Sequence, residues 1–454
     1  MAEIKNDKPA STLWSSQGGL EKIVSWAKRR GFIFPSSEIY GGLGGVYDFG
    51  PYGLALKNNI KRLWWKNFVE DRDDVVGIES SVLMSRKVWQ ASGHENGFTD
   101  ELIECKKCNK RFKSDDMPIE KCPKGGEHDC TAPKAFNGMF KTFVGVTQDE
   151  TSQTYLRPET AQGMFTDFKQ VLETSRKKIP FGIAQMGKCF RNEINTKDYL
   201  FRVREFEIAE MEYFVKLGDD EKSFENALEF MKAFILGIGI KEENLVDYEH
   251  PKAGLSHYSK RTVDIQYKFP FGTKELAGLA NRTDFDLKAH QEVSGKDLQY
   301  FDAETNEKYF PYVIEPTFGV ERLMLALICD AFEELDSRTE TTEAVTEKET
   351  VLHFNPSIAP VKIAVLPLSK KLSTDAKKIY DDLKKCWSAI EFDESGSIGK
   401  RYRRQDEIGT PFCVTVDFDT IEKDQKVTVR DRDSMKQERI EIKDLKNYFF
   451  EKLN

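Results

Sequence analysis

The stretch from residue 181 to residue 214 constrains the fold of this chain most strongly. Polar and apolar residues alternate from Ile183 to Arg191 and again from Phe201 to Phe214. A loop of Asn, Thr and Asp residues, 192–200, separates the two runs. Alternation on both sides of such a loop predicts an antiparallel hairpin.

The predicted hairpin carries an unusual set of side chains on defined faces, because side chains alternate along a strand. Arg191 and Glu193 share a face of the first strand. One face of the second strand carries Arg202, Arg204, Phe206, Ile208 and Glu210, and the other carries Glu205, Glu207 and Ala209. Arginine can hold a phosphate, a carboxylate can read an amino edge, and a ring can stack on a base. The hairpin is therefore either a nucleotide site or a solvated hairpin with charge pairs across its strands.

Helical spacing marks two segments near the N-terminus. Residues 19–30 form the first predicted helix, and residues 54–71, after Pro51, form a longer one. The longer helix carries an apolar stripe of Leu56, Ile60, Leu63, Trp64 and Phe68. This stripe fits either a helix of the chain's own core or a helix at a subunit interface.

Residues 99–135 have the cysteine spacing of a metal-binding ribbon. Cys105 and Cys108 form a Cys-x-x-Cys pair, whereas the second pair is incomplete because Gly125 replaces its second cysteine. Either Cys130 or His128 can complete a tetrahedral zinc site with the first pair and Cys122. We predict a structural zinc held by Cys105, Cys108, Cys122 and Cys130. The alternative is a ribbon that has decayed into an ordinary loop.

Three further places carry polar residues at predicted strand or helix ends. Glu159 lies where a strand meets a helix, and Glu275 and Arg282 lie among small residues that allow a ligand to approach closely. Gly319 and Arg322 lie at the start of a helix, where free N–H groups favour phosphate. Each is a candidate ligand contact, although a carboxylate at a helix start also stabilises the helix dipole.

From residue 361 strands alternate with helices, which predicts a small α/β unit. Its basic residues, Lys400, Arg401, Arg403 and Arg404, form either a solvated helix face or an RNA-binding patch on an acidic protein of net charge −8. The N-terminus lacks a signal-peptide core, no apolar run has transmembrane length, and four of the eight cysteines are scattered singly. We therefore predict a cytoplasmic protein without a membrane partner.

Several motifs in this order resemble those of class II aminoacyl-tRNA synthetases. FRNE with FRVREF resembles motif 2, FGVERLMLAL resembles motif 3, and GPYGLALKNNIKRLWWKNFV resembles motif 1. RPETAQG, ELAGLANRTDFDL and EPTFG are similar to the homodimeric glycyl-tRNA synthetase family. Thr317 stands where that family usually has serine, which keeps the hydroxyl and adds a methyl group.

The resemblance implies an α+β fold, with an antiparallel catalytic sheet flanked by helices and a C-terminal α/β anticodon-binding domain. The expected divisions are an N-terminal catalytic part with motif 1 (1–98), the insertion (99–135), the catalytic core (136–335), a linker (336–360) and the anticodon-binding domain (361–454). Motif 1 implies a homodimer, because this motif packs across the dimer in the class.

The resemblance also implies the reaction. Glycine and ATP form glycyl-adenylate and pyrophosphate, and glycine then passes to the 3′ end of tRNA(Gly). A class II synthetase for another amino acid is one alternative, but its site must accommodate a side chain. A non-catalytic synthetase-like protein that binds nucleic acid is the other, but it has no need of phosphate-binding arginines.

The site residues follow residue by residue from the resemblance. Arg191, Glu193 and Arg322 are the expected catalytic residues, and Glu275 is a ligand of Mg²⁺. ATP is expected to contact Arg191, Asn192, Glu193, Phe201, Arg202, Val203, Arg204, Glu205, Phe206, Glu275, Leu276, Gly319, Val320, Glu321 and Arg322. Glycine is expected to contact Glu159, Phe206, Glu207, Ile208, Ala209, Glu210, Arg282, Glu315, Pro316, Thr317, Phe318 and Gly319.

Overall fold

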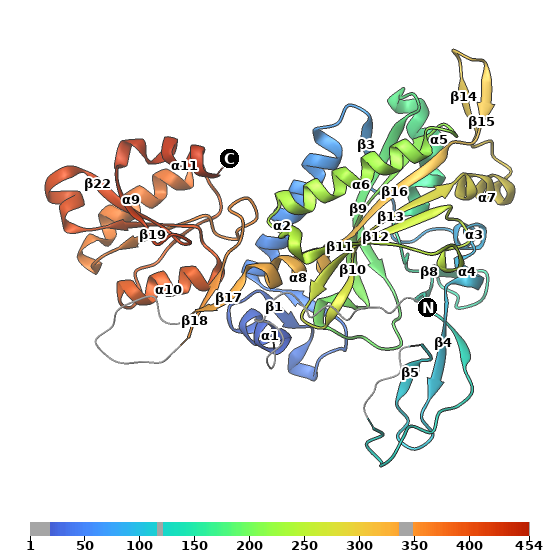
Figure 1. The fold of residues 1–454 in the computed structure, drawn as a ribbon, viewed down its shortest axis with the longest axis horizontal. Helices are drawn as coiled ribbons and strands as arrows, with labels where there is room; N and C mark the ends of the chain where they lie inside the picture. Colours follow the sequence, from blue (N-terminus) through green and yellow to red (C-terminus); the bar gives the residue numbers. More distant parts are fainter. Residues whose placement is uncertain (1–18, 116–120, 336–347, 454) are drawn as a thin grey trace, which may run out of the picture.

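The structure is a computed structural model that describes residues 19–115, 121–335 and 348–453. Its centre is a seven-stranded sheet in the order β11-β12-β13-β16-β10-β9-β3 (Figure 1). Only the pair β3–β9 is parallel among these strands. The strands are β3 (Val75–Gly77), β9 (Phe181–Phe190), β10 (Glu205–Val215), β11 (Leu245–Glu249), β12 (Arg261–Phe269), β13 (Gly272–Thr283) and β16 (Tyr312–Gly319).

The predicted hairpin is formed by β9 and β10, with Glu205 opposite Phe190 and Phe214 opposite Phe181. The alternation predicted that the second strand begins at Phe201. In the structure it begins at Glu205. The intervening chain turns at Asp198 and Tyr199, which have positive φ, and buries Leu200 and Phe201 in a short 3₁₀ turn, Tyr199–Phe201. Arg202 and Arg204 therefore lie in the loop and do not share the strand face of Phe206.

Helices cover both faces of this sheet. One core joins Ala184, Met211 and Phe318 to α1 (Gly19–Arg29), α2 (Pro51–Trp65), α6 (Asp220–Gly237) and α8 (Val320–Ala331). The core on the opposite face joins Ile183 and Phe214 to α5 (Ala161–Ser175) and α7 (Phe285–Ser294). The fold is thus the expected α+β arrangement of an antiparallel sheet between helices.

The apolar stripe of α2 belongs to the first of these cores. Leu56, Ile60, Trp64 and Phe68 are at most 1% exposed and pack within the chain itself. The expectation that this stripe forms a subunit interface is wrong, because its side chains are already buried by α6, α8 and the sheet. Proline at the first helical position fits the start of α2, since proline has no N–H to satisfy there.

Smaller elements surround the sheet. The cysteine-rich insertion folds as a separate sheet in the order β5-β4-β6, which projects from the body in Figure 1. Its strands are β4 (Thr99–Glu104), β5 (Arg111–Lys113) and β6 (Lys134–Asn137). The remaining elements are β1 (Ile33–Pro35), β2 (Tyr47–Phe49), α3 (Arg86–Ala91), α4 (His94–Gly97), β7 (Lys141–Phe143), β8 (Gln153–Tyr155), β14 (Tyr300–Asp302) and β15 (Glu307–Tyr309).

The C-terminal residues form the predicted α/β unit, a five-stranded sheet in the order β20-β19-β21-β22-β23 (Figure 1). Its strands are β19 (Ile363–Pro367), β20 (Ile390–Phe392), β21 (Phe412–Val416), β22 (Lys426–Asp431) and β23 (Gln437–Glu441). Its helices are α9 (Ser373–Lys384), α10 (Ile398–Ile408) and α11 (Leu445–Leu453). None of the helices formed by the described residues is both long and apolar enough to cross a membrane.

The segment predicted as a linker is packed wherever it is described. β18 (Glu349–Leu352) pairs with β17 (Phe332–Leu335), and Phe354, Ile358 and Ala359 are buried in the core of the large sheet. Ile408 of α10 joins that same core. Residues 336–347 of this predicted linker lie outside the described residues. The described end of this segment and Ile408 therefore pack against the core of the large sheet, while the C-terminal strands have a core of their own.

Candidate active site

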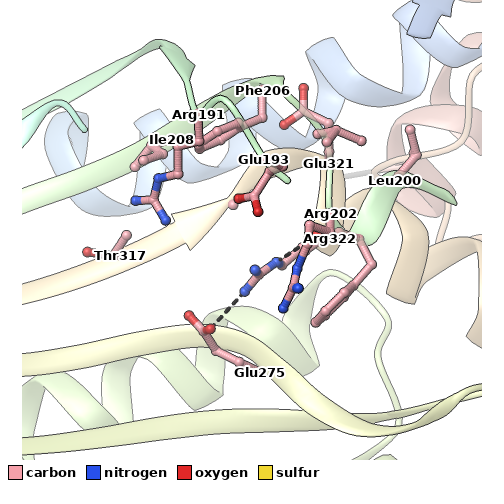
Figure 2. Close-up of a pocket in the computed structure, with 13 residues that line it drawn as sticks. Arg191, Glu193, Leu200, Arg202, Phe206, Ile208, Glu275, Thr317, Glu321 and Arg322 are labelled. Atoms are coloured by element: carbon pink, nitrogen blue, oxygen red, sulfur yellow. Dashed lines mark hydrogen bonds and ion pairs between the residues drawn. The ribbon is translucent and has the colours of Figure 1, made fainter. Parts of the chain in front are cut away.

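A pocket opens beside the hairpin (Figure 2). Its walls come from the β9–β10 loop, β10, β13, the end of β16 and the first turn of α8. The lining residues are Arg191, Glu193, Leu200, Phe201, Arg202, Val203, Phe206, Ile208, Glu275, Thr317, Gly319, Glu321 and Arg322. Most of the residues expected to contact ATP are among them, so the fold brings together groups far apart in the sequence.

Arg191 lies at the end of β9, against the pocket wall. Its Nε donates to the Pro158 carbonyl oxygen at 3.1 Å, and its guanidinium lies 5.4 Å from the centroid of the Phe206 ring. It also lies 5.5 Å from the ring of Phe98, which directly precedes the insertion. Two rings and a carbonyl therefore hold this cation in one orientation, which suits a fixed phosphate contact.

Arg322 and Glu275 face each other across the pocket (Figure 2). Arg322 Nη1 lies 2.8 Å from Glu275 Oε2, and its Nε donates to the Phe201 carbonyl oxygen at 3.1 Å. The guanidinium of Arg322 lowers the pKa of Glu275 and keeps it ionised. Figure 2 shows the guanidinium group of Arg202 beside that of Arg322. These arginines and the start of α8 make this end of the pocket suited to anionic groups.

Other residues of the predicted nucleotide site hold the loop in shape. Arg204 donates to the carbonyl oxygens of Gly44 and Glu193, and the N–H of Asn192 donates to the Gly138 carbonyl oxygen at 2.7 Å. Glu205 pairs with Lys188 across the hairpin. Burial raises the pKa of Glu193, which lines the pocket, although Arg202 and Arg191 oppose this change.

A second, buried group of polar residues lies on the same face of the sheet. Thr160 and Thr317 donate to the two carboxylate oxygens of Glu210, at 2.5 and 2.9 Å. Arg282 is 1% exposed and lies 2.7 Å from Glu315 Oε1, while its other nitrogens form a two-point contact with Asp286 at 2.8 and 2.9 Å. Four of the expected glycine-binding residues, Glu210, Arg282, Glu315 and Thr317, therefore lie together in this buried group.

Burial acts differently on the carboxyl groups of this network. Burial and the charge of Glu159 raise the pKa of Glu210. Burial also raises the pKa of Glu315, against the effect of Arg282. For Glu159 the favourable charges of His94, 3.2 Å away, and Arg282 outweigh burial and lower the pKa. Crowded carboxylates of this kind are relieved by a bound cation.

Several predicted contacts point away from the pocket or into the core. The carboxylate of Glu207 lies on the other face of the sheet, 2.6 Å from both Lys57 and Lys61 of α2. Its predicted role as a glycine contact is therefore wrong for the side chain. Glu321 lines the pocket, but its carboxylate is paired with Lys57 at 2.6 Å. The side chains of Ala209, Leu276, Phe318 and Val320 are buried in the hydrophobic core, and Pro316 is also buried.

The structure adds residues that sequence reasoning missed. Glu212 lies two positions after Glu210 on β10, and its carboxyl group lies within 4.8 Å of those of Glu210 and Glu315. Asp264 on β12 pairs with His250 at 2.8 Å. Asp286 and His94 complete the buried network. The alternation on β10 could have indicated Glu212, whereas the other three depend on contacts across elements.

The insertion gathers its cysteines around one point. The ligand atoms of Cys105, Cys108, Cys122 and His128 all lie within 4.8 Å of one another. The Cys105 and Cys122 sulfur atoms are 3.9 Å apart, and Cys108 Sγ is 3.7 Å from His128 Nδ1. Cys130, the predicted fourth ligand, is not in this group, and it lies opposite Cys105 in an isolated antiparallel bridge. His128 takes its place.

The basic cluster of α10 is mostly engaged within the chain. Arg401 is 3% exposed and donates to the carbonyl oxygens of Pro367 and Gly396. Arg403 pairs with Glu349 at 2.9 Å, and Arg404 pairs with Asp393 at 2.6 Å. These arginines therefore do not form the free RNA-binding patch that the sequence suggested, and only Lys400 of the four is exposed.

Comparisons with known proteins agree with this architecture. Residues 141–331 match the family described as tRNA synthetase class II core domain (G, H, P, S and T), and residues 362–452 match the family described as anticodon binding domain. The structure of Giardia lamblia prolyl-tRNA synthetase in complex with prolyl-adenylate superposes with a TM-score of 0.66 at 16% identity, covering 94% of this chain and 75% of that one. This likeness supports the fold alone.

Relatives similar along almost the whole chain are more specific. The glycine–tRNA ligase of Caldanaerobacter subterraneus subsp. tengcongensis is 53% identical, over 96% of this chain and 98% of its own. Those of Clostridium acetobutylicum and Streptomyces coelicolor are 51% and 52% identical with the same coverage. With this similarity and the class II core behind it, the chain belongs to the glycine–tRNA ligase family.

Proposed function

We propose that this protein is a glycine–tRNA ligase, which activates glycine with ATP and transfers it to the 3′ end of tRNA(Gly). One observation carries the proposal: the arginine-lined pocket and the buried acidic network meet at Thr317, which lines the pocket and donates to Glu210 at 2.9 Å. A nucleotide phosphate and an amino-acid ammonium can therefore be held side by side.

The nucleotide end of the site works by charge and position. Arg191 would hold the α-phosphate and the glycine carboxylate at the reacting centre, and Arg322 would hold the γ-phosphate. Phe206 would stack on adenine, with Glu193 near its amino group. Attack of a carboxylate on phosphorus needs little acid or base help, so oriented cations supply most of the catalysis.

Mg²⁺ fits the donor set at Glu275. This carboxylate is 46% exposed in its side chain, is ionised, and faces the pocket, and oxygen ligands are those that Mg²⁺ prefers. When bound with ATP, the ion would neutralise phosphate charge. Glu275 would hold the ion, and Arg322, its partner in this structure, would contact the phosphate.

The glycine end recognises a substrate that has no side chain. Glu159, Glu210 and Glu315 would surround the ammonium group, while Arg282 holds the carboxylates in place. Thr317 would limit the space at Cα. An amino acid with a side chain, such as alanine, would overlap Thr317. Steric overlap of this kind excludes a larger substrate more effectively than the loss of one favourable contact would.

Pyrophosphate exchange with each of the twenty amino acids tests the assignment. We expect exchange with glycine and not with alanine or serine. Efficient exchange with threonine, proline or histidine would identify a different class II synthetase. Absence of exchange with any amino acid, together with RNA binding, would identify a non-catalytic protein of this fold.

We further propose that residues 361–454 bind the anticodon stem-loop. The match of residues 362–452 to the anticodon-binding family supports this proposal. Lys400→Glu reverses an exposed charge in this unit, so it should lower tRNA charging and leave pyrophosphate exchange unchanged. A matched reversal of an exposed lysine on α6, Lys222→Glu, should affect neither. Equal loss of exchange and charging in the Lys400 variant would argue against the assignment.

A structural zinc ion fits the insertion. Tetrahedral Zn²⁺ with Zn–S near 2.3 Å and Zn–N near 2.0 Å separates two sulfurs by about 3.8 Å and a sulfur from a nitrogen by about 3.5 Å. The observed 3.9 and 3.7 Å are close to these edges. Four protein ligands leave no open position, so the ion would stabilise the ribbon and take no part in the reaction.

Elemental analysis of the dialysed protein tests this site. We expect one zinc per chain, which His128→Ala and Cys122→Ser remove and Cys130→Ser retains. If the Cys130 variant loses zinc and the His128 variant keeps it, the fourth ligand is Cys130, as the sequence predicted. Absence of zinc from the unaltered protein would mean that the ribbon has lost its metal.

A further inference from the structure

Glu212 is a buried carboxyl group in an unusual position. It is 0% exposed, and neither of its oxygens has a hydrogen-bond partner among the described residues. It lies within 4.8 Å of the carboxyl groups of Glu210 and Glu315. An isolated carboxylate without a donor is among the most costly groups to bury, so its surroundings must compensate in another way.

The charges around Glu212 come from every element packed against it. β10 supplies Glu210, β16 supplies Glu315, β13 supplies Arg282 and α7 supplies Asp286, with Glu159 next to this group. Arg282 is the cation, and its nitrogens contact Asp286 and Glu315. Carboxyl groups therefore outnumber arginines, and like charges this close do not all ionise.

The hydrogen bonds indicate which group carries the proton. Both oxygens of Glu210 already accept a threonine hydroxyl, and one oxygen of Glu315 accepts Arg282. Thr317 pairs with Glu210 on neighbouring strands, and Tyr213 pairs with Ile314, so Glu212 lies level with Glu315. A proton on Glu212 can therefore bridge to the second oxygen of Glu315.

We propose that Glu212 is a positioning residue of the glycine site, held as a neutral carboxylic acid that donates its O–H to Glu315. It touches no substrate. Its hydrogen bond orients the Glu315 carboxylate toward the position of the glycine ammonium group. Because Glu212 is neutral, the negative charge of the site stays small enough for the ammonium group and Arg282 to balance. Burial and the charges of Glu315 and Glu210 also raise its pKa well above that of an ordinary glutamate. This inference rests on the proposed glycine-binding role of the network.

Two variants of the full-length protein test the role by pyrophosphate exchange. Glu212→Gln keeps a neutral N–H donor, so the glycine KM should stay within about threefold of the original. Glu212→Leu removes the donor, so the glycine KM should rise roughly tenfold or more while the ATP KM is unchanged. If the Gln variant loses glycine as severely as the Leu variant, an ionised Glu212 is required and the proposal is wrong.

Infrared difference spectroscopy at neutral pH supplies a readout that does not depend on activity. Protein labelled with ¹³C-glutamate should show the C=O stretch of a protonated carboxyl, and Glu212→Gln should lack it. Absence of this band would overturn the proposal, as would a glycine KM that depends on K⁺ or Na⁺, which would indicate a cation among the carboxylates. If the Leu variant does not fold, the Gln variant and the spectrum decide. If the unaltered protein does not activate glycine, the proposed function fails, while the spectrum still reports the proton.

Discussion

At the scale of single residues, the site depends on arginines whose positions are set by neighbouring groups rather than by water. Arg191 lies between the rings of Phe98 and Phe206 and donates to the Pro158 carbonyl oxygen. Such an arrangement removes the reorganisation that a flexible cation would undergo when phosphate charge develops. The effect of losing this cation should therefore appear in the chemical step.

Arg191→Ala should reduce glycyl-adenylate formation by a factor of roughly 100 or more, which corresponds to about 3 kcal/mol. The fold should persist, since Arg191 contributes one hydrogen bond to a carbonyl oxygen. Pyrophosphate exchange measures the first effect and thermal melting the second. Arg176→Ala, an exposed arginine at the end of α5, is the matched control and should match the original protein. Near-normal exchange in the Arg191 variant would contradict its phosphate role.

Glycine binding should weaken as the pH falls, because the ammonium group needs ionised carboxylates. Burial and Glu159 raise the pKa of Glu210, so Glu210 takes up a proton at a higher pH than an ordinary glutamate, near 4.3. As the pH falls, the glycine KM should thus begin to rise at a higher pH than it would for an ordinary glutamate, while the ATP KM stays flat. Kinetics between about pH 5 and pH 8 test this, and a glycine KM that is constant over the range would refute it.

At the scale of elements, a buried ion triad joins three of them. Lys57 of α2 lies 2.6 Å from both Glu207 of β10 and Glu321 of α8, and Glu321 also accepts the N–H of Glu207 at 2.8 Å. The side chains of Lys57 and Glu321 are 7% and 5% exposed. Ion pairs thereby connect motif 1 on α2 to motif 2 on β10 and motif 3 on α8, behind the pocket.

Lys57→Ala should destabilise the protein by about 3–5 kcal/mol, because it leaves Glu321 buried without a cation and Glu207 with Lys61 alone. Lys61→Ala removes a more exposed partner of Glu207 and should cost about 1 kcal/mol or less. Urea unfolding of the two variants measures the difference. A similarly small decrease in the free energy of unfolding of both variants would mean that water reaches Glu207 and Glu321 once Lys57 is absent.

At the scale of the whole molecule, we propose a homodimer, but with a surface different from the α2 stripe. Ile39 and Tyr40 are each 87% exposed, Leu43 is 61% exposed, and Leu54 at the start of α2 is 50% exposed. Clustered exposed apolar residues in one segment are typical of an interaction surface. The dimer role predicted for motif 1 would then rest on the loop before α2 and on its outer side.

Tyr40→Asp combined with Ile39→Asp should convert the dimer into monomers, since charges would be buried at the contact. Sedimentation velocity at micromolar concentration measures the change. The double variant Val144→Asp, Val146→Asp alters other exposed apolar residues and should remain dimeric. If the unaltered protein is monomeric, the proposed homodimer is wrong.

The sequence by itself determined the local elements and the positions of the motifs. Alternation located β9 and β10, helical spacing located α1 and α2, and the motif residues around Arg191, Glu275 and Arg322 line one pocket. These features depend on neighbours in the chain, which a sequence displays directly. The sequence placed the start of β10 at Phe201 instead of Glu205, because the burial of Leu200 and Phe201 depends on α8 and on distant aromatic residues.

Only the tertiary structure decided which distant groups share a charge or a proton. It paired Glu207 with Lys57, placed His128 instead of Cys130 beside the other cysteines, and buried the stripe of α2 within the chain. It also brought Glu212 against Glu315 and engaged the arginines of α10 in internal bonds. The physical reason is the same in each case: burial and electrostatic pairing depend on distances across the fold, whereas periodicity reports only the face on which a side chain lies.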